Sequence, residues 1–334
     1  MDVVRVAVVG AGSWGTTIAS LVAQNAPTML WSRRHDVAES INARRFNERY
    51  LPGLPLNPQL RASTSLAEVV ANADVLVMGV PSHGFRDTLA ALAPYVRPWV
   101  PVVSLAKGLE QGTRLRMTEV VEQVLPGHPA GVLTGPNLSK EILSGHPAAA
   151  VIAMADDVIA ERLQGVLASD LYRVYTNNDV IGCELAGALK NVIALAAGIA
   201  NGLGTGDNTL AAVITRGLSE LTRLGVAMGG QPATFAGLAG MGDLVATCIS
   251  EQSRNRYVGQ QLARGCALAD IVADMNQVAE SIKTVPVVKE LAGEYSVDMP
   301  ITNEMYEVIV NGRSALEAYR GLLQRKVGRE VHHA

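Results

Sequence analysis

The most distinctive chemical feature of the sequence is a lysine inside its most apolar segment. Lys190 and Asn191 lie in the run 180–204, which is otherwise rich in Ala, Leu and Ile and has the length of a helix. Lysine is rarely buried without a function or a partner, and an amine in apolar surroundings can donate and accept protons. The alternatives are a lysine whose ammonium reaches solvent, or a structural ion pair with Glu184 or another carboxylate.

A second segment carries the polar groups of a phosphate site. Ser253, Arg254 and Asn255 precede an expected helix. A hydroxyl, a guanidinium and an amide therefore lie beside the N–H groups of a helix start, which suits a phosphate. The alternative is an ordinary helix cap followed by a solvated arginine.

A third segment places one carboxylate among glycines. Asp243 follows Gly240, Met241 and Gly242, and a loop is expected here. Its carboxylate can orient the lysine or a hydroxyl of a substrate. Taken alone, the segment is better explained as an ordinary turn aspartate.

A glycine-rich loop near the N-terminus has the pattern G-x-G-x-x-G, formed by Gly10, Gly12 and Gly15. It follows a short valine-rich run and precedes a helical segment. In this setting the first glycine permits a tight turn, the second lets backbone approach a pyrophosphate, and the third allows close packing of helix on strand. The N–H groups at the helix start then face the phosphates of a dinucleotide. The alternative is a structural glycine turn.

The end of the second apolar run favours NADP over NAD. NAD enzymes usually carry Asp or Glu about 20 residues past the loop, where it binds the ribose 2′-hydroxyl. This chain instead has Ser32, Arg33 and Arg34 there, and guanidinium groups suit a 2′-phosphate. The alternative is a pair of solvated arginines, and Asp36 can partly neutralise their charge.

Alternating apolar and helical segments indicate the fold of the first half. Strands are expected at 3–9, 28–31, 75–80, 100–105 and 131–134, with helices at 16–24, 66–71 and 85–93 between them. This alternation predicts βαβ units and a mostly parallel sheet. Together with the glycine loop, it predicts an α/β protein that begins with a Rossmann-type doubly wound sheet.

After about residue 177 the pattern is helical throughout. Helices are expected at 180–200, 209–224, 256–264, 268–275, 281–295 and 301–311. The predicted domains are therefore 1–178, which binds the dinucleotide, and an all-α domain over 179–334, with Asn178 or Asp179 as a cap of its first helix. Lys107 and the segment 135–137 follow expected strands, at the edge where doubly wound sheets bind ligands.

Composition limits the class of partner. The formal net charge is −3, which argues against nucleic acid. The three cysteines, Cys183, Cys248 and Cys266, suggest neither a disulfide framework nor a metal site, and a cytoplasmic protein without a metal fits best. The charged residues within 180–204 make a buried helix a better interpretation than a membrane span.

Together these segments resemble the bacterial NAD(P)-dependent glycerol-3-phosphate dehydrogenases. The resemblance extends from Gly10 to Glu280 and is carried by short motifs along the chain, which read GAGSWGTT, VPSH, AKGLE, GPNLSKE, LKNV, ITRGLSE, GMGDLV, QSRNR and VAE. The order of LKNV, GDL and SRNR is far more specific than the glycine loop.

The resemblance implies roles for particular residues. It implies that Lys190 transfers a proton and that Asp243 positions the amine or a substrate hydroxyl. Substrate ligands implied by it are Lys107, Gly135, Asp243, Ser253, Arg254 and Asn255. Cofactor contacts implied by it are Ser13, Trp14, Arg33, Lys107, Ser139, Arg254, Val278 and Glu280, to which the sequence adds Arg34. One departure concerns Asn137, since the family usually has Ser or Thr there, although an amide can still bind substrate.

The resemblance implies reversible reduction of dihydroxyacetone phosphate to sn-glycerol 3-phosphate, a precursor of glycerophospholipids. The two arginines add a preference for NADPH, with NADH possible. One rival is a β-hydroxyacid dehydrogenase of related plan, which the Ser253-Arg254-Asn255 segment disfavours. Another is a dinucleotide-binding redox sensor without turnover, which Lys190 and Asp243 disfavour. The oligomeric state stays open, a homodimer included.

Overall fold

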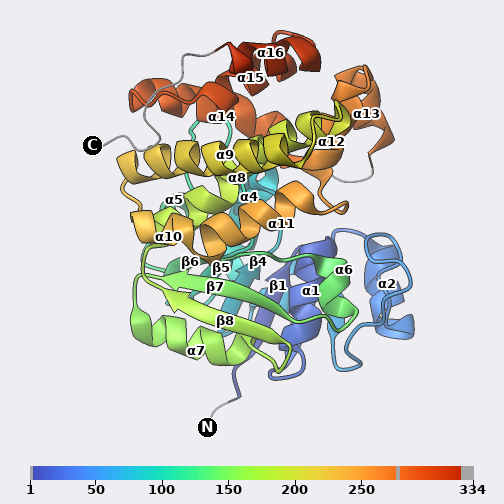
Figure 1. Cartoon of the computed structure of the whole chain (residues 1–334). Coiled ribbons are helices and arrows are strands. Elements are labelled where there is room, and N and C mark those ends of the chain that lie inside the picture. Colours follow the sequence, from blue (N-terminus) through green and yellow to red (C-terminus); the bar gives the residue numbers. More distant parts are fainter. Residues whose placement is uncertain (1–2, 276–278, 325–334) are drawn as a thin grey trace. The chain divides into compact units, whose positions relative to one another are not determined.

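The computed structural model describes residues 3–275 and 279–324 and divides the chain into two compact units (Figure 1). The first unit comprises Met1–Leu189 and Gly225–Ala246, and the second comprises Lys190–Leu224 and Thr247–Ala334. The chain thus leaves the first unit, returns to it for one segment, and leaves it again.

The first unit is built on an eight-stranded sheet with the order β3-β2-β1-β4-β5-β6-β7-β8. Its strands are β1 (Val6–Val9), β2 (Thr28–Trp31), β3 (Arg61–Ser63), β4 (Val75–Met78), β5 (Val102–Ser104), β6 (Ala130–Thr134), β7 (Ala148–Met154) and β8 (Tyr172–Asn177). Neighbouring strands are parallel, except that β6 and β7 are antiparallel. The predicted doubly wound, mostly parallel sheet is confirmed.

Helices cover both faces of this sheet because its central strands are apolar on both sides. All four residues of β1 are buried. Val6 and Val8 pack in one apolar layer, with side chains of α1 (Ser13–Val22), α2 (His35–Arg44) and α7 (Asp157–Leu167). Ala7 and Val9 pack in the other, with side chains of α3 (Leu66–Val70), α4 (Phe85–Leu92) and α5 (Met117–Val124). Alternate residues of one strand therefore support opposite layers.

Three strands lie outside the ranges expected from the sequence. β3 has three residues at one edge of the sheet, and β8 at the other edge alternates between buried and exposed residues. β7 begins with three alanines, which are more typical of a helix than of a strand. Pairing with β6 and β8 determines its conformation.

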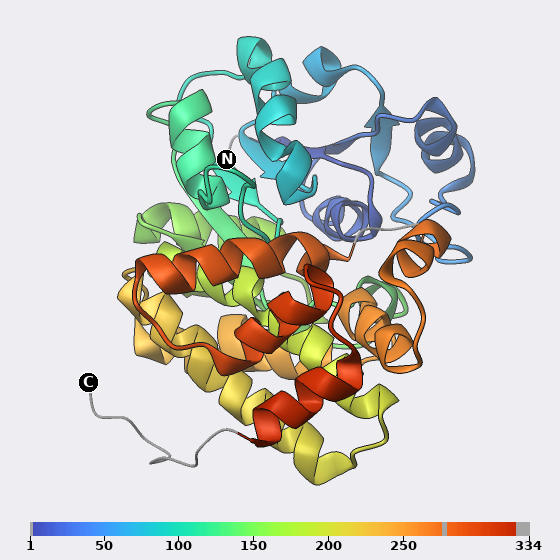
Figure 2. The same ribbon diagram turned by 90° about the horizontal axis from the view of Figure 1, so that it is seen from above.

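The chain after β8 is helical in the described residues. Its helices are α8 (Val180–Gly202), α9 (Asp207–Ala227), α10 (Pro232–Ala236), the π-helical turn η3 (Leu238–Gly242), α11 (Asp243–Ile249), α12 (Arg254–Ala263), α13 (Leu268–Asp274), α14 (Glu280–Glu294), α15 (Pro300–Ile309) and α16 (Ala315–Leu323). Within the second unit, α15 contacts α14 and α16, while α12 contacts α13 and α16 (Figure 2). The predicted all-helical second half is confirmed.

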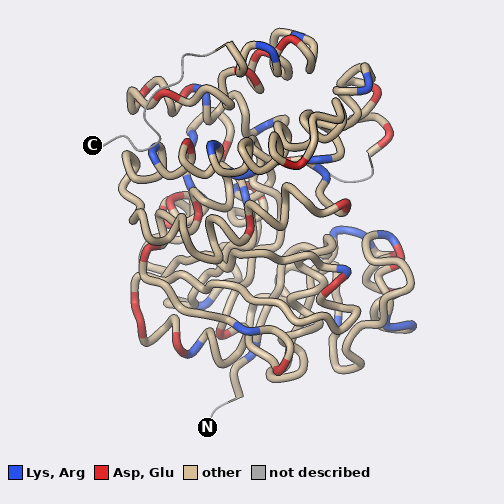
Figure 3. The backbone as a smooth tube through the Cα atoms, in the orientation of Figure 1, with Lys and Arg blue, Asp and Glu red and all other residues tan. Residues whose placement is uncertain are grey.

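One helix of the described chain is long and apolar enough to cross a membrane, namely α8. Most of its apolar stretch is buried inside the protein. Acidic and basic residues are scattered along the backbone of both units, among long stretches of uncharged residues (Figure 3). A core helix is therefore the better interpretation of α8.

Candidate active site

The glycine loop forms a tight turn between β1 and α1. Gly10 has a φ of 118°, and a Cβ atom there would lie 2.7 Å from the carbonyl carbon of Gly79. A Cβ at Gly15 would lie 2.0 Å from the carbonyl oxygen of Gly10. Only glycine fits these two positions, because the backbones of β1, α1 and the end of β4 approach one another so closely.

The middle glycine of the loop is open, in contrast. A Cβ at Gly12 would meet no atom within 4 Å, and Gly12 begins α1 without a side-chain cap. Buried Asn47 holds the loop from behind by donating to the carbonyl of Ala11 at 3.0 Å and to Thr16 Oγ1 at 2.8 Å. The start of α1 thus presents backbone to a ligand, as a pyrophosphate requires. The sequence gives no sign of this role, because a lone asparagine belongs to no motif.

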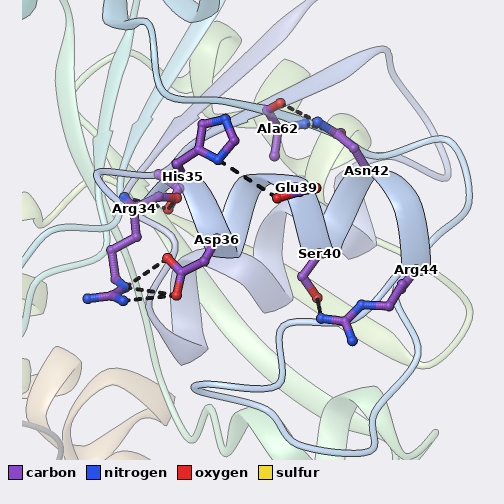
Figure 4. A network of polar contacts seen from close by, with 9 residues as sticks. Arg34, His35, Asp36, Glu39, Ser40, Asn42, Arg44 and Ala62 are labelled. Atoms are coloured by element: carbon purple, nitrogen blue, oxygen red, sulfur yellow. Dashed lines mark hydrogen bonds and ion pairs between the residues drawn. The ribbon is translucent and has the colours of Figure 1, made fainter.

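The turn after β2 carries the two arginines and an acid. Arg34 Nε and Nη2 donate to the two oxygens of Asp36 at 3.0 and 2.9 Å, as Figure 4 shows. This hydrogen bond lowers the pKa of Asp36 below its usual value. Arg33 is exposed, and its side chain makes no hydrogen bond or ion pair within residues 3–275 and 279–324. Buried Ser32 accepts from the N–H of Arg34 at 3.1 Å and shapes the turn.

Lys107 follows β5, and it forms a partly buried ion pair with Asp243 of α11. Lys107 Nζ donates to Asp243 Oδ2 at 2.7 Å and to the carbonyl oxygen of Gly135 at 2.8 Å. The side chain of Asp243 is only 3 % exposed, and that of Lys107 is 18 % exposed. Three of the predicted substrate ligands therefore lie together. Gly135 has a φ of 127° and passes close to β7, where a Cβ would lie 3.1 Å from Ala150 Cα.

Asp243 lies at the start of a helix, so the predicted loop is wrong here. The π-helical turn η3 leads directly into α11, whose first residue is Asp243. Gly240 makes this turn possible, because a Cβ there would lie 2.1 Å from the carbonyl oxygen of Phe235. A carboxylate at the start of a helix is stabilised by the helix dipole. The glycines that suggest a loop instead permit tight helical packing.

Asn137 is held by a tyrosine that the sequence does not point to. Tyr172 Oη donates to Asn137 Oδ1 at 3.2 Å, and its ring meets the ring of Trp14 edge-on at 6.3 Å. Burial raises the pKa of Tyr172, so its hydroxyl stays a donor. Asn137 Nδ2 and Trp14 Nε1 are buried without a hydrogen-bond partner in the described part of the chain. The departure from the family at Asn137 therefore belongs to a cluster beside the glycine loop. Ser139, two residues further on, begins α6 (Ser139–Leu143).

The first turns of α8 are fixed inside the first unit. Asp179 Oδ1 accepts from the N–H of Gly182 at 2.8 Å, which confirms Asp179 as one of the two predicted caps. Glu184 accepts from Arg116 at 2.8 Å and from the backbone of Thr118 at 2.9 Å. Burial raises the pKa of Glu184, and the Arg116 charge opposes that rise.

In the second unit, Lys190 is buried, which excludes the alternative of an ammonium that reaches solvent. Its residue is 4 % exposed, and Nζ donates to Thr247 Oγ1 at 2.5 Å. Asn191 accepts at Oδ1 from Asn255 Nδ2 at 2.8 Å, and Asn255 Oδ1 accepts from the N–H of Ser281 at 3.0 Å. Asn255 therefore ties together α8, α12 and the start of α14. It serves the helix framework, and its predicted contact with substrate stays a prediction.

The predicted phosphate site lies at the start of α12. Ser253 caps this helix by accepting from the N–H of Arg256 at 3.3 Å. Arg254 is exposed and interacts electrostatically with Glu280, the first residue of α14. Of the predicted cofactor contacts, Val278 lies outside the described residues.

These features fit a nicotinamide dinucleotide. The open backbone at Gly12 accommodates a pyrophosphate, and the guanidinium groups of Arg33 and Arg34 after β2 suit the far end of such a cofactor. Among the described residues, no group of three or more His, Cys, Asp and Glu side chains is placed to hold a metal ion. Fold and site together define a two-domain, dinucleotide-dependent dehydrogenase.

Comparison with known proteins agrees with this class and narrows it. Residues 5–160 match the model of the NAD-dependent glycerol-3-phosphate dehydrogenase N-terminus, and residues 179–320 match that of the C-terminus. The chain therefore belongs to the NAD-dependent glycerol-3-phosphate dehydrogenase family.

Individual relatives are similar over nearly their whole length. The chain is 55 % identical to "Glycerol-3-phosphate dehydrogenase [NAD(P)+] 2" of Sphingopyxis alaskensis, over 98 % of both chains. It is 54 % identical to "Glycerol-3-phosphate dehydrogenase [NAD(P)+]" of Mycobacterium avium, over 98 % of this chain and 96 % of the other. A crystal structure of glycerol-3-phosphate dehydrogenase from Coxiella burnetii superposes with a TM-score of 0.92 at 35 % identity, covering 96 % of this chain and 99 % of that one.

Proposed function

We propose that this protein interconverts dihydroxyacetone phosphate and sn-glycerol 3-phosphate and uses NADPH in preference to NADH. Family membership supports the reaction, since curated relatives at more than 50 % identity are named glycerol-3-phosphate dehydrogenase [NAD(P)+]. The structural observation that carries the chemistry is the buried ammonium of Lys190 in α8. The reduced product, sn-glycerol 3-phosphate, would supply the glycerol backbone of phospholipids.

Lys190 would transfer the proton. Its amine is removed from solvent and held by Thr247. The protonated amine donates to the ketone oxygen during reduction, and the neutral amine takes the hydroxyl proton in the reverse direction. The bound dinucleotide supplies or accepts the hydride.

The remaining polar residues would bind and orient the substrate. Lys107 and Asp243 form a preformed, partly buried pair that offers both a donor and an acceptor to hydroxyl and carbonyl groups. Arg254 and the N–H groups at the start of α12 would bind the phosphate. Binding energy from the phosphate helps to orient the ketone, so substrates without a phosphate should react poorly.

NADPH preference rests on the turn after β2. No carboxylate occupies the end of β2, and Arg33 and Arg34 follow it. Replacing both arginines by Ala should raise the KM for NADPH by about tenfold or more and leave the KM for NADH within about twofold. An equal rise in KM for both cofactors would show that the two arginines do not recognise the 2′-phosphate.

The reaction itself is tested by following NADPH oxidation at 340 nm. Dihydroxyacetone phosphate should be reduced rapidly, whereas dihydroxyacetone and a panel of β-keto acids should not. Rapid reduction of a keto acid without phosphate would favour the β-hydroxyacid alternative. Tight binding of NADPH without turnover of any ketone would favour the redox sensor.

The proposal extends to the compartment and the assembly. Cys183 and Cys248 are buried free thiols and Cys266 is an exposed one, which suits the reducing cytoplasm. Leu316 and Leu323 of α16 are 44 % and 66 % exposed and lie seven residues apart, on one side of the helix. A homodimer interface would cover such side chains, and sedimentation equilibrium measures whether one forms.

A further inference from the structure

The acid beside the two arginines is placed to act on cofactor choice. Asp36 lies on the first turn of α2, and both of its oxygens face the guanidinium of Arg34 (Figure 4). Three donor–acceptor distances between these two side chains lie between 2.9 and 3.3 Å. Both side chains are exposed, at 45 % for Arg34 and 61 % for Asp36, so a ligand can reach them.

We propose that Asp36 restrains the binding of a 2′-phosphate at this turn and thereby lets the protein use both NADPH and NADH. The inference rests on the proposed function, in which Arg33 and Arg34 bind that phosphate. It assigns a specificity role to a residue that lies outside the glycine loop and outside the arginine pair.

The first reason is occupancy of the guanidinium. Arginine has five N–H donors in a planar fork. Asp36 takes the Nε side of Arg34 together with one donor of Nη2. A phosphate therefore cannot accept from Nε and Nη2 together. Only the donors of Nη1 and the second donor of Nη2 remain for it.

The second reason is charge. A phosphate monoester carries about −1.5 to −2 at neutral pH, so the carboxylate of Asp36 repels it. The 2′-hydroxyl of NADH carries no charge and is not repelled in this way. Asp36 also holds Arg34 in place, which favours phosphate binding. An exposed pair orders its partners only weakly, however, so we expect the repulsion of a nearly doubly charged group to dominate.

Other charged groups on α2 act on this turn less directly. His35 Nδ1 lies 3.8 Å from Glu39, on another side of the helix from the Arg34–Asp36 pair (Figure 4). Arg44 lies more than two turns from the start of α2, and its guanidinium donates to Ser40. Glu39 is thus a matched control, since it is an exposed acid on the same helix that does not contact Arg34.

The test compares Asp36→Asn with Glu39→Gln by calorimetric titration, without turnover. The probes are adenosine 2′,5′-bisphosphate, which carries the 2′-phosphate, and adenosine 5′-monophosphate, which lacks it. Asp36→Asn should tighten the bisphosphate by about threefold, because it removes one negative charge and keeps an acceptor for Arg34. The monophosphate should change by less than about twofold, and Glu39→Gln should have little effect on either probe.

Bisphosphate affinity that weakens, or changes by less than about twofold, in Asp36→Asn overturns the inference. The double variant Arg33→Ala, Arg34→Ala separates this result from failure of the proposed function. If that variant binds the bisphosphate as tightly as wild type, the arginines do not hold the phosphate and both ideas fail. If it loses the bisphosphate while Asp36→Asn is unchanged, only the role of Asp36 fails.

Discussion

Replacing Lys190 by Met removes the proposed proton-transfer group with little change in shape. Met has similar length and is apolar, so it suits the buried position in α8. Loss of a general acid–base group reduces turnover by about 10²–10⁴. The KM for NADPH should change little, because the glycine loop belongs to the first unit and Lys190 to the second.

The effect on stability separates this mechanism from a structural role. Met replaces an ammonium that is 4 % exposed, which relieves the desolvation of a charge. Thr247 loses one hydrogen-bond donor at the same time, at a cost of about 1 kcal/mol. The free energy of unfolding should therefore change by no more than about 2 kcal/mol. If Lys190 were instead a structural ion-pair partner, the variant should lose about 3–5 kcal/mol of unfolding free energy and keep nearly normal turnover.

The assay measures steady-state NADPH oxidation with dihydroxyacetone phosphate, beside urea unfolding of the same preparations. Lys289→Met serves as the control, because this exposed lysine of α14 bonds to Asn303 and touches no residue of the proposed site. A folded Lys190→Met protein that turns over within about threefold of wild type would remove Lys190 from the mechanism.

Three further predictions concern other parts of the chain. Arg254→Ala should raise the KM for dihydroxyacetone phosphate by about tenfold or more. The slow reaction of dihydroxyacetone should change far less, because this ketone carries no phosphate. Equal effects on both substrates would show that Arg254 does not bind the phosphate. Tyr172→Phe removes the donor to Asn137 Oδ1 and should lower the free energy of unfolding by about 1 kcal/mol. It should also raise the KM for dihydroxyacetone phosphate if Asn137 binds substrate; an unchanged KM would make the pair purely structural. Burial raises the pKa of Glu220 to about 7, well above the usual value for a carboxyl group, although Glu220 accepts from backbone N–H groups at the start of α15. The folded state therefore holds a proton that the unfolded chain releases, so this group's contribution to stability is complete below about pH 4.5 and declines by up to about 3 kcal/mol as the pH rises to about 7 and beyond. Urea unfolding of wild type and Glu220→Gln at about pH 5 and pH 8 measures this, and a difference between the two proteins that does not vary with pH would refute it.

Several features of the molecule follow directly from local sequence. β2 occupies the predicted residues 28–31, and α8 begins at the predicted residue 180. Both predictions are confirmed because a buried parallel strand and a buried helix each have a strong apolar pattern over their own residues. The roles of Gly10 and Gly15 also follow from the sequence, because their spacing indicates the tight turn and the close packing that require glycine.

Local sequence does not predict the edges of the sheet or the partners of polar side chains. β3 and β8 depend on pairing with one neighbour only, and β7 is an alanine-rich strand enforced by two neighbours. The return of segment 225–246 to the first unit has no local signal, because it depends on contacts with residues far away in the sequence.

The sequence by itself determined which residue types are available for chemistry and roughly where they stand. A lysine in an apolar helix, arginines after β2 and a glycine loop after β1 are all local facts. Only the tertiary structure decided how distant groups are engaged: Asp243 pairs with Lys107, Asn255 bonds to Asn191, and Tyr172 holds Asn137. The physical reason is that a hydrogen bond or ion pair depends on atoms within a few ångströms of one another, and residues brought that close by folding, such as Lys107 and Asp243 at 2.7 Å, are separated by 136 positions in the sequence.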